Sequence, residues 1–246
     1  MSNMHARPVA IITGAGSGIG REIAIQLAGR GYALTVVGRT LAKLQETALL
    51  TGLPIAEVFC LVADVGDQAQ AVGIVDATVQ RFGRLDVLIN NAGYAPPAPI
   101  EGKTPEKIRA IFDINAVGPA TMIARAWPIF KAQAPRAGAR HVVVNVSSYA
   151  TVDPFPTLFA YAAAKAGVNL MARSVANEGR LYKTFGFAVA PGAVETDMLR
   201  AIVDRDTLPE RMTLKPADVA RVIVECVSGT RDAQNGQVIY LPSPVS

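Results

Sequence analysis

The feature that most constrains this fold is the alternation of short, almost continuously apolar runs with stretches of helical periodicity. Seven runs have the length and composition of strands: 9–12, 34–37, 58–62, 85–89, 141–146, 187–190 and 238–241. Helical periodicity fills gaps between them, at 18–29, 41–50, 68–82, 160–182 and 216–227. Strands that are apolar on both faces are typical of a parallel sheet covered by helices. The order therefore predicts an α/β fold, a doubly wound parallel sheet of about seven strands with helices on both faces.

The size of the chain fits a single domain that spans residues 1–246. Of the 246 residues, 50% are hydrophobic, which is enough for one sizeable core. No apolar run reaches the roughly 18 residues that a membrane span needs, so no membrane association is predicted. The first eight residues lack the apolar segment of a signal peptide, and we expect a cytoplasmic protein.

Charge and metal-ligand patterns argue against two classes of function. The net charge is +4, but the basic residues are spread along the chain, so nucleic-acid binding is not expected. The two histidines, His5 and His141, lie far apart, and no zinc-ligand spacing with Cys60 or Cys226 exists. We therefore predict no metal site, no catalytic role for His141, and two buried core cysteines.

A glycine-rich loop follows the first predicted strand. The segment TGAGSGIG, residues 13–20, joins that strand to the first helix, where free N–H groups and the helix dipole can bind a phosphate. Glycine lets the backbone approach such a ligand closely. The common dinucleotide fingerprint G-x-G-x-x-G nevertheless fails in every register. Taken alone, the loop is equally consistent with a tight turn that binds nothing.

Four further motifs favour the nucleotide interpretation. NNAG (90–93), NVSS (145–148), YAAAK (161–165) and PGAVET (191–196) follow in order. With TGAGSGIG, which fits T-G-x-x-x-G-x-G, they make the chain similar to the classical short-chain dehydrogenase/reductase family, including its 3-oxoacyl-acyl-carrier-protein reductase-like members. The resemblance runs from about residue 9 to residue 241. It implies a Rossmann-type domain and an NAD(P)-dependent oxidoreductase that transfers hydride between nicotinamide and a carbonyl or secondary alcohol.

The resemblance implies four catalytic residues: Asn115, Ser148, Tyr161 and Lys165. Tyr161 and Lys165 are four positions apart, so they share one face of a helix. Because a nearby ammonium favours the phenolate, we expect Lys165 to lower the pKa of Tyr161, the general acid/base. Lys165 would also bind the nicotinamide ribose. Ser148 would hydrogen-bond the substrate oxygen, and the adjacent Ser147 is its rival.

Asn115 precedes a proline that changes the helix around it. Residue 119 is Pro and has no N–H, so the carbonyl of Asn115 loses its helical partner and the helix should kink nearby. In the family that this chain resembles, the matching asparagine holds a water that passes protons to the lysine. A plain kink with no such role is the alternative.

Further cofactor contacts follow from the same resemblance. The residues are Gly14, Ser17, Gly18, Ile19, Gly20, Arg39, Asp64, Val65, Asn91, Ala92, Gly93, Tyr161, Lys165, Pro191, Gly192, Val194 and Thr196. Asp64 would accept a hydrogen bond from the adenine amino group, although it is also a candidate N-cap, for which Asp67 is better placed. Val194 and Thr196 match positions that contact the nicotinamide carboxamide.

The end of the second strand bears on the choice of cofactor. It reads VVGRT, with no carboxylate to accept from a 2′-hydroxyl or to repel a 2′-phosphate. The guanidinium of Arg39 can pair with a 2′-phosphate. NADP(H) is therefore favoured and NAD(H) is the alternative, since Ser17 is not the basic residue found in some NADP-preferring members.

The substrate is predicted less sharply. Candidate walls are 94–100, 149–159 and 193–212; they contain apolar residues and the acidic Asp153, Glu195 and Asp197, and the first two segments contain no arginine cluster. We expect a neutral small-molecule carbonyl or alcohol. The resemblance implies a homotetramer that uses the helices of Asn115 and Tyr161. A non-catalytic dinucleotide sensor or scaffold is the alternative from another class. The polar segment 132–140 is expected on the surface.

Overall fold

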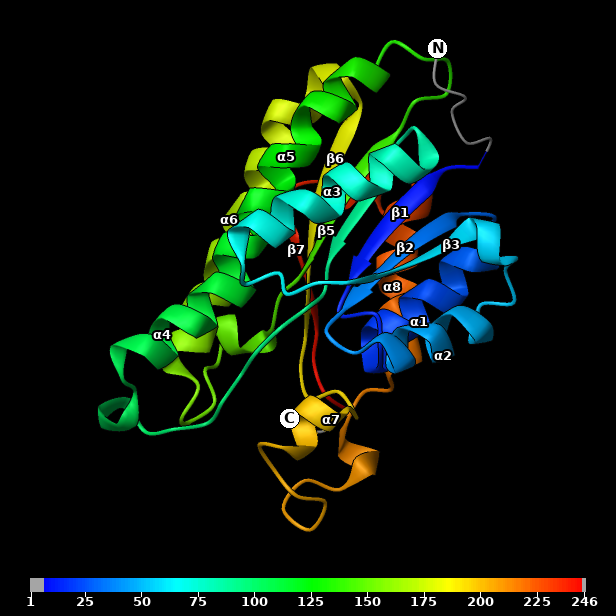
Figure 1. The fold of residues 1–246 in the computed structure, drawn as a ribbon. Helices are drawn as coiled ribbons and strands as arrows, with labels where there is room; N and C mark the ends of the chain where they lie inside the picture. Colours follow the sequence, from blue (N-terminus) through cyan, green and yellow to red (C-terminus); the bar gives the residue numbers. More distant parts are fainter. Residues whose placement is uncertain (1–6, 245–246) are drawn as a thin grey trace.

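The computed structural model describes residues 7–244 and confirms the predicted sheet (Figure 1). The strands are β1 (Val9–Thr13), β2 (Ala33–Gly38), β3 (Val58–Val62), β4 (Val87–Asn90), β5 (His141–Val146), β6 (Thr184–Pro191) and β7 (Val238–Leu241). All neighbours are parallel, in the order β3-β2-β1-β4-β5-β6-β7. The chain order reverses between β1 and β4, and ligands of doubly wound sheets bind at the carboxyl ends beside such a reversal.

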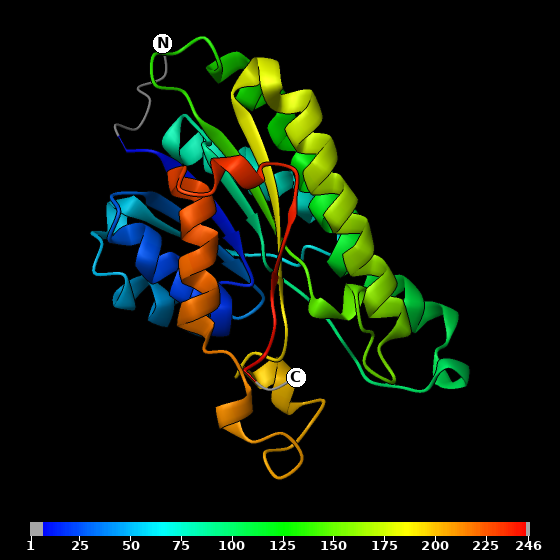
Figure 2. The same cartoon turned by 180° about the vertical axis from the view of Figure 1, so that it is seen from behind.

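Helices cover both faces of this sheet (Figure 2). They are α1 (Gly18–Ala28), α2 (Leu41–Leu50), α3 (Gln68–Phe82), α4 (Pro105–Phe112), α5 (Gly118–Gln133), α6 (Phe159–Gly179), α7 (Asp197–Arg200) and α8 (Pro216–Ser228). Helices α1, α2 and α8 lie on one face, and α3, α5 and α6 lie on the other. Within residues 7–244, no helix has both the length and the apolarity needed to cross a membrane.

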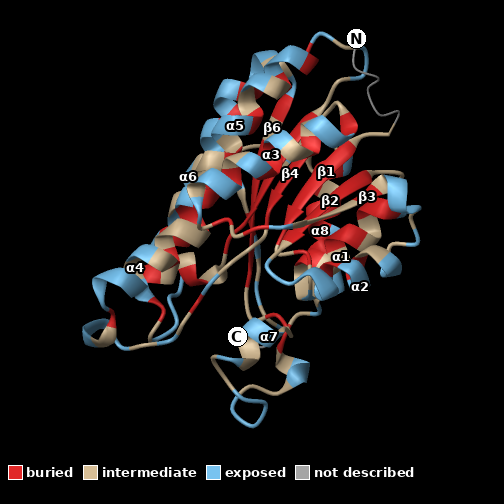
Figure 3. Cartoon of the chain, viewed as in Figure 1, coloured by how far each residue is buried: buried red, intermediate tan, exposed pale blue. Residues whose placement is uncertain are grey.

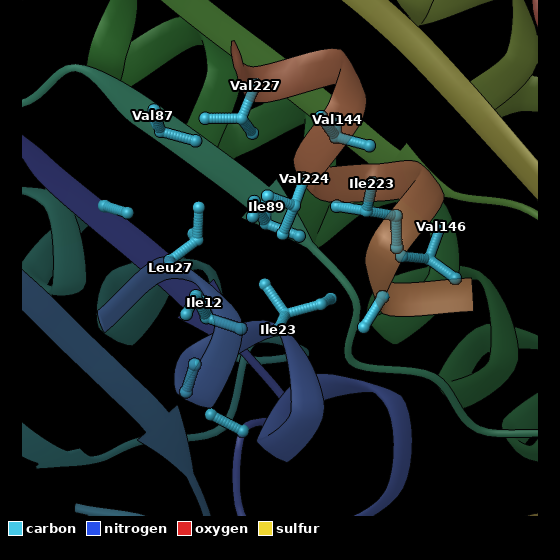
Figure 4. Close-up of a cluster of buried hydrophobic side chains, with 14 of the residues drawn as sticks. Ile12, Ile23, Leu27, Val87, Ile89, Val144, Val146, Ile223, Val224 and Val227 are labelled. Atoms are coloured by element: carbon cyan, nitrogen blue, oxygen red, sulfur yellow. The ribbon is translucent and has the colours of Figure 1, made fainter. Parts of the chain in front are cut away.

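The core consists of two apolar layers that the strands separate (Figure 3). Successive residues of β1 point into different layers: Ile12 packs in the layer of α1 and α8, and Ile11 in that of α3 and α5. Figure 4 shows Ile23 and Leu27 of α1 beside Ile12, and Ile223 of α8 beside Val146 in the same cluster. Strands buried on both faces explain why the sequence runs are apolar without alternation.

Several details differ from the sequence-based expectations. Strand β6 begins at Thr184, and Cys60 is only partly buried, so the expectation of two buried core cysteines is confirmed for Cys226 alone. Strand β4 begins at Val87 rather than at Leu85, because the side-chain amide of Gln133 bonds both the N–H and the carbonyl of Leu85. Gln133 and Ala134 are both buried, so the surface expectation for 132–140 is wrong at those two positions. His141 is buried at the start of β5 against the ring of Phe130, and burial lowers the pKa of this histidine to about 4. His5 lies outside the described residues.

Candidate active site

One cavity of about 800 Å³ lies at the carboxyl ends of β1, β4, β5 and β6. Nearly all of the residues singled out from the sequence line it: Gly14, Ser17, Gly18, Ile19, Arg39, Asp64, Val65, Asn91, Ala92, Gly93, Ser148, Tyr161, Lys165, Pro191, Gly192, Val194 and Thr196. Gly20 and Asn115 do not line the cavity. We call the part around Gly14, Ser17, Gly18, Arg39 and Lys43 the glycine-loop end.

The glycine loop is a backbone cradle that side chains would fill. Gly14 and Gly18 have φ values of +65° and +52°, which favour glycine. A Cβ on Gly18 would lie 3.0 Å from Cγ2 of Thr196, and one on Gly20 would lie 2.3 Å from the carbonyl oxygen of Gly14. Ser17 is the N-cap of α1 but makes no side-chain capping bond, and the first turn has no acidic residue. This end of α1 therefore fits the pyrophosphate of a dinucleotide.

Thr13 joins the glycine loop to the NNAG segment. Its hydroxyl accepts hydrogen bonds from the N–H groups of Asn91 (2.9 Å) and Ala92 (3.0 Å). The amide of Asn91 donates in return to the carbonyl of Thr13, at 2.8 Å. Thr13 is a positioning residue that the sequence analysis did not single out, although it opens the T-G-x-x-x-G-x-G motif.

Asn115 lies in one π-helical turn, Asp113–Val117, between α4 and α5. The irregular turn confirms a disturbed helix before Pro119. The buried Asn115 amide donates to the carbonyls of Tyr94 and Ile111, both at 2.8 Å, and its oxygen accepts from the N–H of Tyr94 at 3.2 Å. Its side chain thus fixes the backbone that follows β4 at the cavity wall.

The two serines after β5 have different partners. The Ser147 hydroxyl is buried and donates to the carbonyl of Lys165 at 3.3 Å. The Ser148 hydroxyl hydrogen-bonds Tyr161 and accepts from the N–H of Ala150 at 3.2 Å. Of the two serines, this geometry supports Ser148 as the one beside the reacting group.

Tyr161 and Lys165 share the inner face of α6. The ammonium of Lys165 lies 5.7 Å from the centre of the Tyr161 ring and donates to the carbonyl of Val146 at 2.7 Å. Burial lowers the pKa of Lys165 to about 8. Burial also raises the pKa of Tyr161, and the hydrogen bond with Ser148 only partly opposes this. For the cofactor-free protein, the expectation of a lowered Tyr161 pKa is therefore wrong, because desolvation is the largest effect.

Two cations lie at the glycine-loop end. Arg39 follows β2, and Lys43 lies in the first turn of α2, where its Cβ is 3.1 Å from the position of a Cβ on Gly16. The ammonium of Lys43 lies 3.7 Å from the carboxylate of Asp197. Sequence reasoning missed Lys43, since only the α2 helix brings it beside the glycine loop.

Asp64 and Asp67 divide the roles that the sequence left open. Asp67 is the N-cap of α3 and accepts from the N–H groups of Ala69 and Gln70, as expected. The Asp64 carboxylate accepts from the N–H of Gly66 at 2.8 Å and lines the cavity.

The opposite part of the cavity, which we call the apolar end, has a different lining. Its residues are Tyr94, Ala95, Tyr149, Ala150, Asp153, Phe155, Leu158, Met198, Leu199, Ile202, Val203, Thr207, Leu208 and Met212. Pro96 to Ile100 are not among them, so the expected wall 94–100 is wrong beyond Ala95. Glu195 does not line the cavity either, because its carboxylate is engaged elsewhere.

Glu195 anchors the residues that cover the apolar end. Its carboxylate accepts two hydrogen bonds from Arg200, one of them at 3.0 Å, and one from Arg205 at 3.0 Å. Arg200 also donates to the carbonyl of Leu208 at 2.8 Å. The bonds from Arg200 hold the pKa of Glu195 at about 2. We call residues 197–212 the covering segment. Its helix α7 and its later residues are held together by the ion cluster of Glu195, Arg200 and Arg205 and by the bond from Arg200 to Leu208.

Comparison with known proteins agrees with this geometry. Residues 8–207 match the family model for short chain dehydrogenases. Levodione reductase of Leifsonia aquatica is 37% identical, over 78% of this chain and 71% of that protein. The 3-oxoacyl-(acyl-carrier-protein) reductase of Thermotoga maritima is 35% identical over 94% of both chains. The crystal structure of 3-ketoacyl-(acyl-carrier-protein) reductase from Brucella melitensis complexed with NADH gives a TM-score of 0.87, with 30% identity and 97% of both chains covered. The chain therefore belongs to the short-chain dehydrogenase/reductase family and is an oxidoreductase that acts on C=O or CH–OH groups.

Proposed function

We propose that the protein is an NADP(H)-dependent reductase of small carbonyl compounds, or dehydrogenase of the matching alcohols, with Tyr161 as general acid/base. One observation carries the proposal: the Ser148, Tyr161 and Lys165 side chains line the same cavity as the glycine loop. A dinucleotide on the loop and a substrate at Tyr161 therefore share one space. The names of the relatives, each a reductase, support the carbonyl direction.

The chemistry divides among these side chains. The bound nicotinamide would supply or accept the hydride. Tyr161 gives a proton to the carbonyl oxygen in reduction and takes it from the alcohol in oxidation. Ser148 donates a hydrogen bond to the same oxygen and stabilises the charge that develops on it. Lys165, with its pKa near 8, holds a positive charge beside Tyr161 at neutral pH and also binds the ribose hydroxyls.

Asn115 has a positioning role in this proposal. Its amide bonds fix the Tyr94 backbone, and its main-chain carbonyl, in the π-helical turn before Pro119, would hold the water that passes protons to Lys165. The side-chain oxygen of Asn115, which accepts from the N–H of Tyr94, lies 3.3 Å from the position of a Cβ on Gly93. That same Cβ position lies 3.8 Å from the Lys165 ammonium, which supports a short path between the two residues.

Preference for NADP(H) rests on the cations of the glycine-loop end. Arg39 offers a guanidinium that pairs with a 2′-phosphate, and Lys43 supplies the second positive charge that Ser17 does not. The N-cap residue of α2, Thr40, makes no side-chain capping bond and leaves its hydroxyl for a ligand. The Brucella melitensis reductase was crystallised with NADH, so NAD(H) is the second candidate.

Substitution of Tyr161 tests the catalytic proposal. Tyr161→Phe should reduce turnover of any carbonyl substrate by at least about a thousandfold, while the affinity for NADPH stays unchanged in a fluorescence titration. Tyr149→Phe is the matched control, because Tyr149 lines the same cavity and packs against Tyr240 without an acid/base role. Full activity of Tyr161→Phe would refute the mechanism. NADPH binding by a wild-type protein that reduces no carbonyl would instead favour a sensor or scaffold.

Nucleotide titrations test the cofactor. Arg39→Ala and Lys43→Ala should each weaken NADPH binding by about tenfold, because each removes a charged hydrogen bond. NADH binding should stay within about twofold, since NADH has no 2′-phosphate. Tighter binding of NADH by the wild type, unaffected by either substitution, would make this an NAD(H) enzyme.

We further propose a cytoplasmic homotetramer assembled through α5 and α6. Val117, just before α5, and Leu170, in the middle of α6, are 39% and 65% exposed, and an interface through these two helices would bury both. Light scattering should give four times the chain mass, and Leu170→Glu should lower it. A monomer at micromolar concentration would contradict the assembly.

A further inference from the structure

We infer that the substrate is bulky, apolar and uncharged around its reacting carbonyl, as in an aryl or alicyclic ketone. The inference rests on the proposed function and deepens it by naming a class of substrate. Three observations carry it: the lining of the apolar end, the state of the nearby arginines, and apolar side chains exposed to the cavity.

The apolar end has no cation with which to bind an acid. None of its lining residues is lysine, arginine or histidine, and its one charged residue is Asp153, an exposed carboxylate that would repel an anion. The basic residues that line the described cavity are Arg39 and Lys43 at the glycine-loop end and Lys165 beside Tyr161. A carboxylate or phosphate on the substrate would therefore lose its hydration and gain no partner.

Two arginines of the covering segment, Arg200 and Arg205, are bound by the chain itself. Arg200 and Arg205 both donate to the Glu195 carboxylate. Arg200 also donates to the carbonyls of Asp204 and Leu208. The Arg200 side chain is only 16% exposed. Two arginines beside a substrate cavity would indicate an anionic substrate, but here they hold the covering segment in place.

Large apolar side chains are exposed at this end of the cavity. Phe155, Met198 and Tyr94 are 56%, 40% and 38% exposed. A ligand that covers this apolar surface removes it from water, and this stabilises the complex. A substrate with a ring or a branched hydrocarbon body would cover these side chains, whereas a small hydrophilic carbonyl would not.

A matched pair of α-keto compounds tests the inference. Ethyl phenylglyoxylate and phenylglyoxylate have the same aryl ketone, but only the second carries a carboxylate. In both, reduction moves hydride from NADPH to the ketone carbon and a proton from Tyr161 to its oxygen, giving the mandelate ester or mandelate with NADP⁺. The wild type should reduce the ester with kcat/KM at least about a hundredfold above that of the acid, because the uncompensated charge has no partner.

A new cation in the wall should reduce that preference for the ester. Phe155→Lys places an ammonium at the rim of the apolar end and should narrow the ratio of ester to acid by at least about tenfold. Val152→Lys is the matched control: Val152 is also 56% exposed but does not line the cavity, so the ratio should stay unchanged. Both positions are exposed, and neither has a catalytic role.

The outcomes separate the inference from the proposed function. Equal or better reduction of the acid by the wild type would overturn the inference, as would an equal response of the two lysine variants. An enzyme that reduces small or charged carbonyls but not the aryl ester would also overturn it. Failure to bind NADPH, or to reduce any carbonyl, would overturn the proposed function.

Discussion

The glycine-loop end of the cavity is built from backbone and offers two cations, whereas the apolar end is built from side chains and offers none. At the first, Gly14 and Gly20 touch neighbouring backbone so closely that no Cβ fits. At the second, apolar side chains face the cavity, and an ion cluster around Glu195 holds the covering segment from outside. Phosphates are recognised by N–H groups and charge, and a hydrocarbon body by apolar area.

Because of this difference, we expect the glycine-loop end to tolerate few substitutions and the apolar end to tolerate many. A backbone cradle fits one geometry and tolerates few substitutions, which suits a cofactor that many enzymes share. An apolar wall of separate side chains can change shape one residue at a time without disturbing the sheet. The two ends meet at Lys165 and Tyr161, so substitutions at the junction and at each end should have separable effects.

Lys165→Met should have the largest effect, because Lys165 serves both ends. We expect activity to fall by at least about a thousandfold through loss of the charge beside Tyr161. The free energy of unfolding should instead rise. Burial lowers the pKa of Lys165 from 10.5 to about 8, so keeping the ammonium charged in the folded state opposes folding below pH 8.

The stability arm of this prediction has a defined pH dependence. A shift of this size corresponds to about 3 kcal/mol, of which the lost bond to the Val146 carbonyl offsets about 1. Urea unfolding should therefore show Lys165→Met to be more stable than the wild type at pH 7 by about 2 kcal/mol. The difference should shrink as pH rises from 8 to 10.5, where the folded wild type loses its charge. A variant less stable at pH 7 would contradict this account.

Gly20→Ala should be next in size and should affect the glycine-loop end. A Cβ at this position would lie 2.3 Å from the Gly14 carbonyl oxygen, and backbone cannot give way as a side chain can. We expect NADPH affinity to fall by about a hundredfold, with about 2 kcal/mol of stability lost to overpacking. Gly73→Ala is the control, since a Cβ on this helical glycine meets nothing within 4 Å and should stabilise α3 by up to about 1 kcal/mol. Equal NADPH affinities for Gly20→Ala and Gly73→Ala would refute the proposal that the close packing at Gly20 shapes the nucleotide site.

Glu195→Gln should affect only the apolar end. The amide cannot pair with both arginines, so the covering segment loosens and the KM for a carbonyl substrate should rise by about tenfold. The dissociation constant of NADPH should not change. Asp76→Asn is the control, because it removes an exposed ion pair with Arg125 that lies away from the cavity. If Glu195→Gln lowered the affinity for NADPH as well as raising the KM for the carbonyl substrate, the two ends would not be independent.

The sequence predicted the layout of the fold better than the contacts of the cavity. Continuous apolar runs identified the buried strands, and the period of 68–82 gave the bounds of α3, because both patterns reflect burial along one segment. Spaced motifs likewise located Tyr161 and Lys165 on one helix face. The family model and the structural neighbours confirm the fold and the family.

Contacts between distant segments could not be predicted in the same way. Lys43 reaches the glycine loop only because α2 packs beside it, and Glu195 captures Arg200 and Arg205 only because the covering segment folds back. The raised pKa of Tyr161 also depends on burial, which a motif does not encode. The cofactor preference and the catalytic roles remain predictions that the nucleotide titrations and the Tyr161 variant can test.

Asp197→Asn should have the smallest effect and tests whether the ends communicate. The Asp197 carboxylate lies 3.7 Å from the Lys43 ammonium, and both groups are exposed, so their attraction is weak. A 2′-phosphate at Lys43 would compete with this carboxylate, and Asp197→Asn should therefore tighten NADPH binding by about threefold without changing NADH binding. In a Lys43→Ala background the gain should disappear, because no ammonium is left to release. A gain that persists without Lys43 would mean that Asp197 acts by general repulsion, and the ion pair would then carry no coupling between the cofactor and the covering segment.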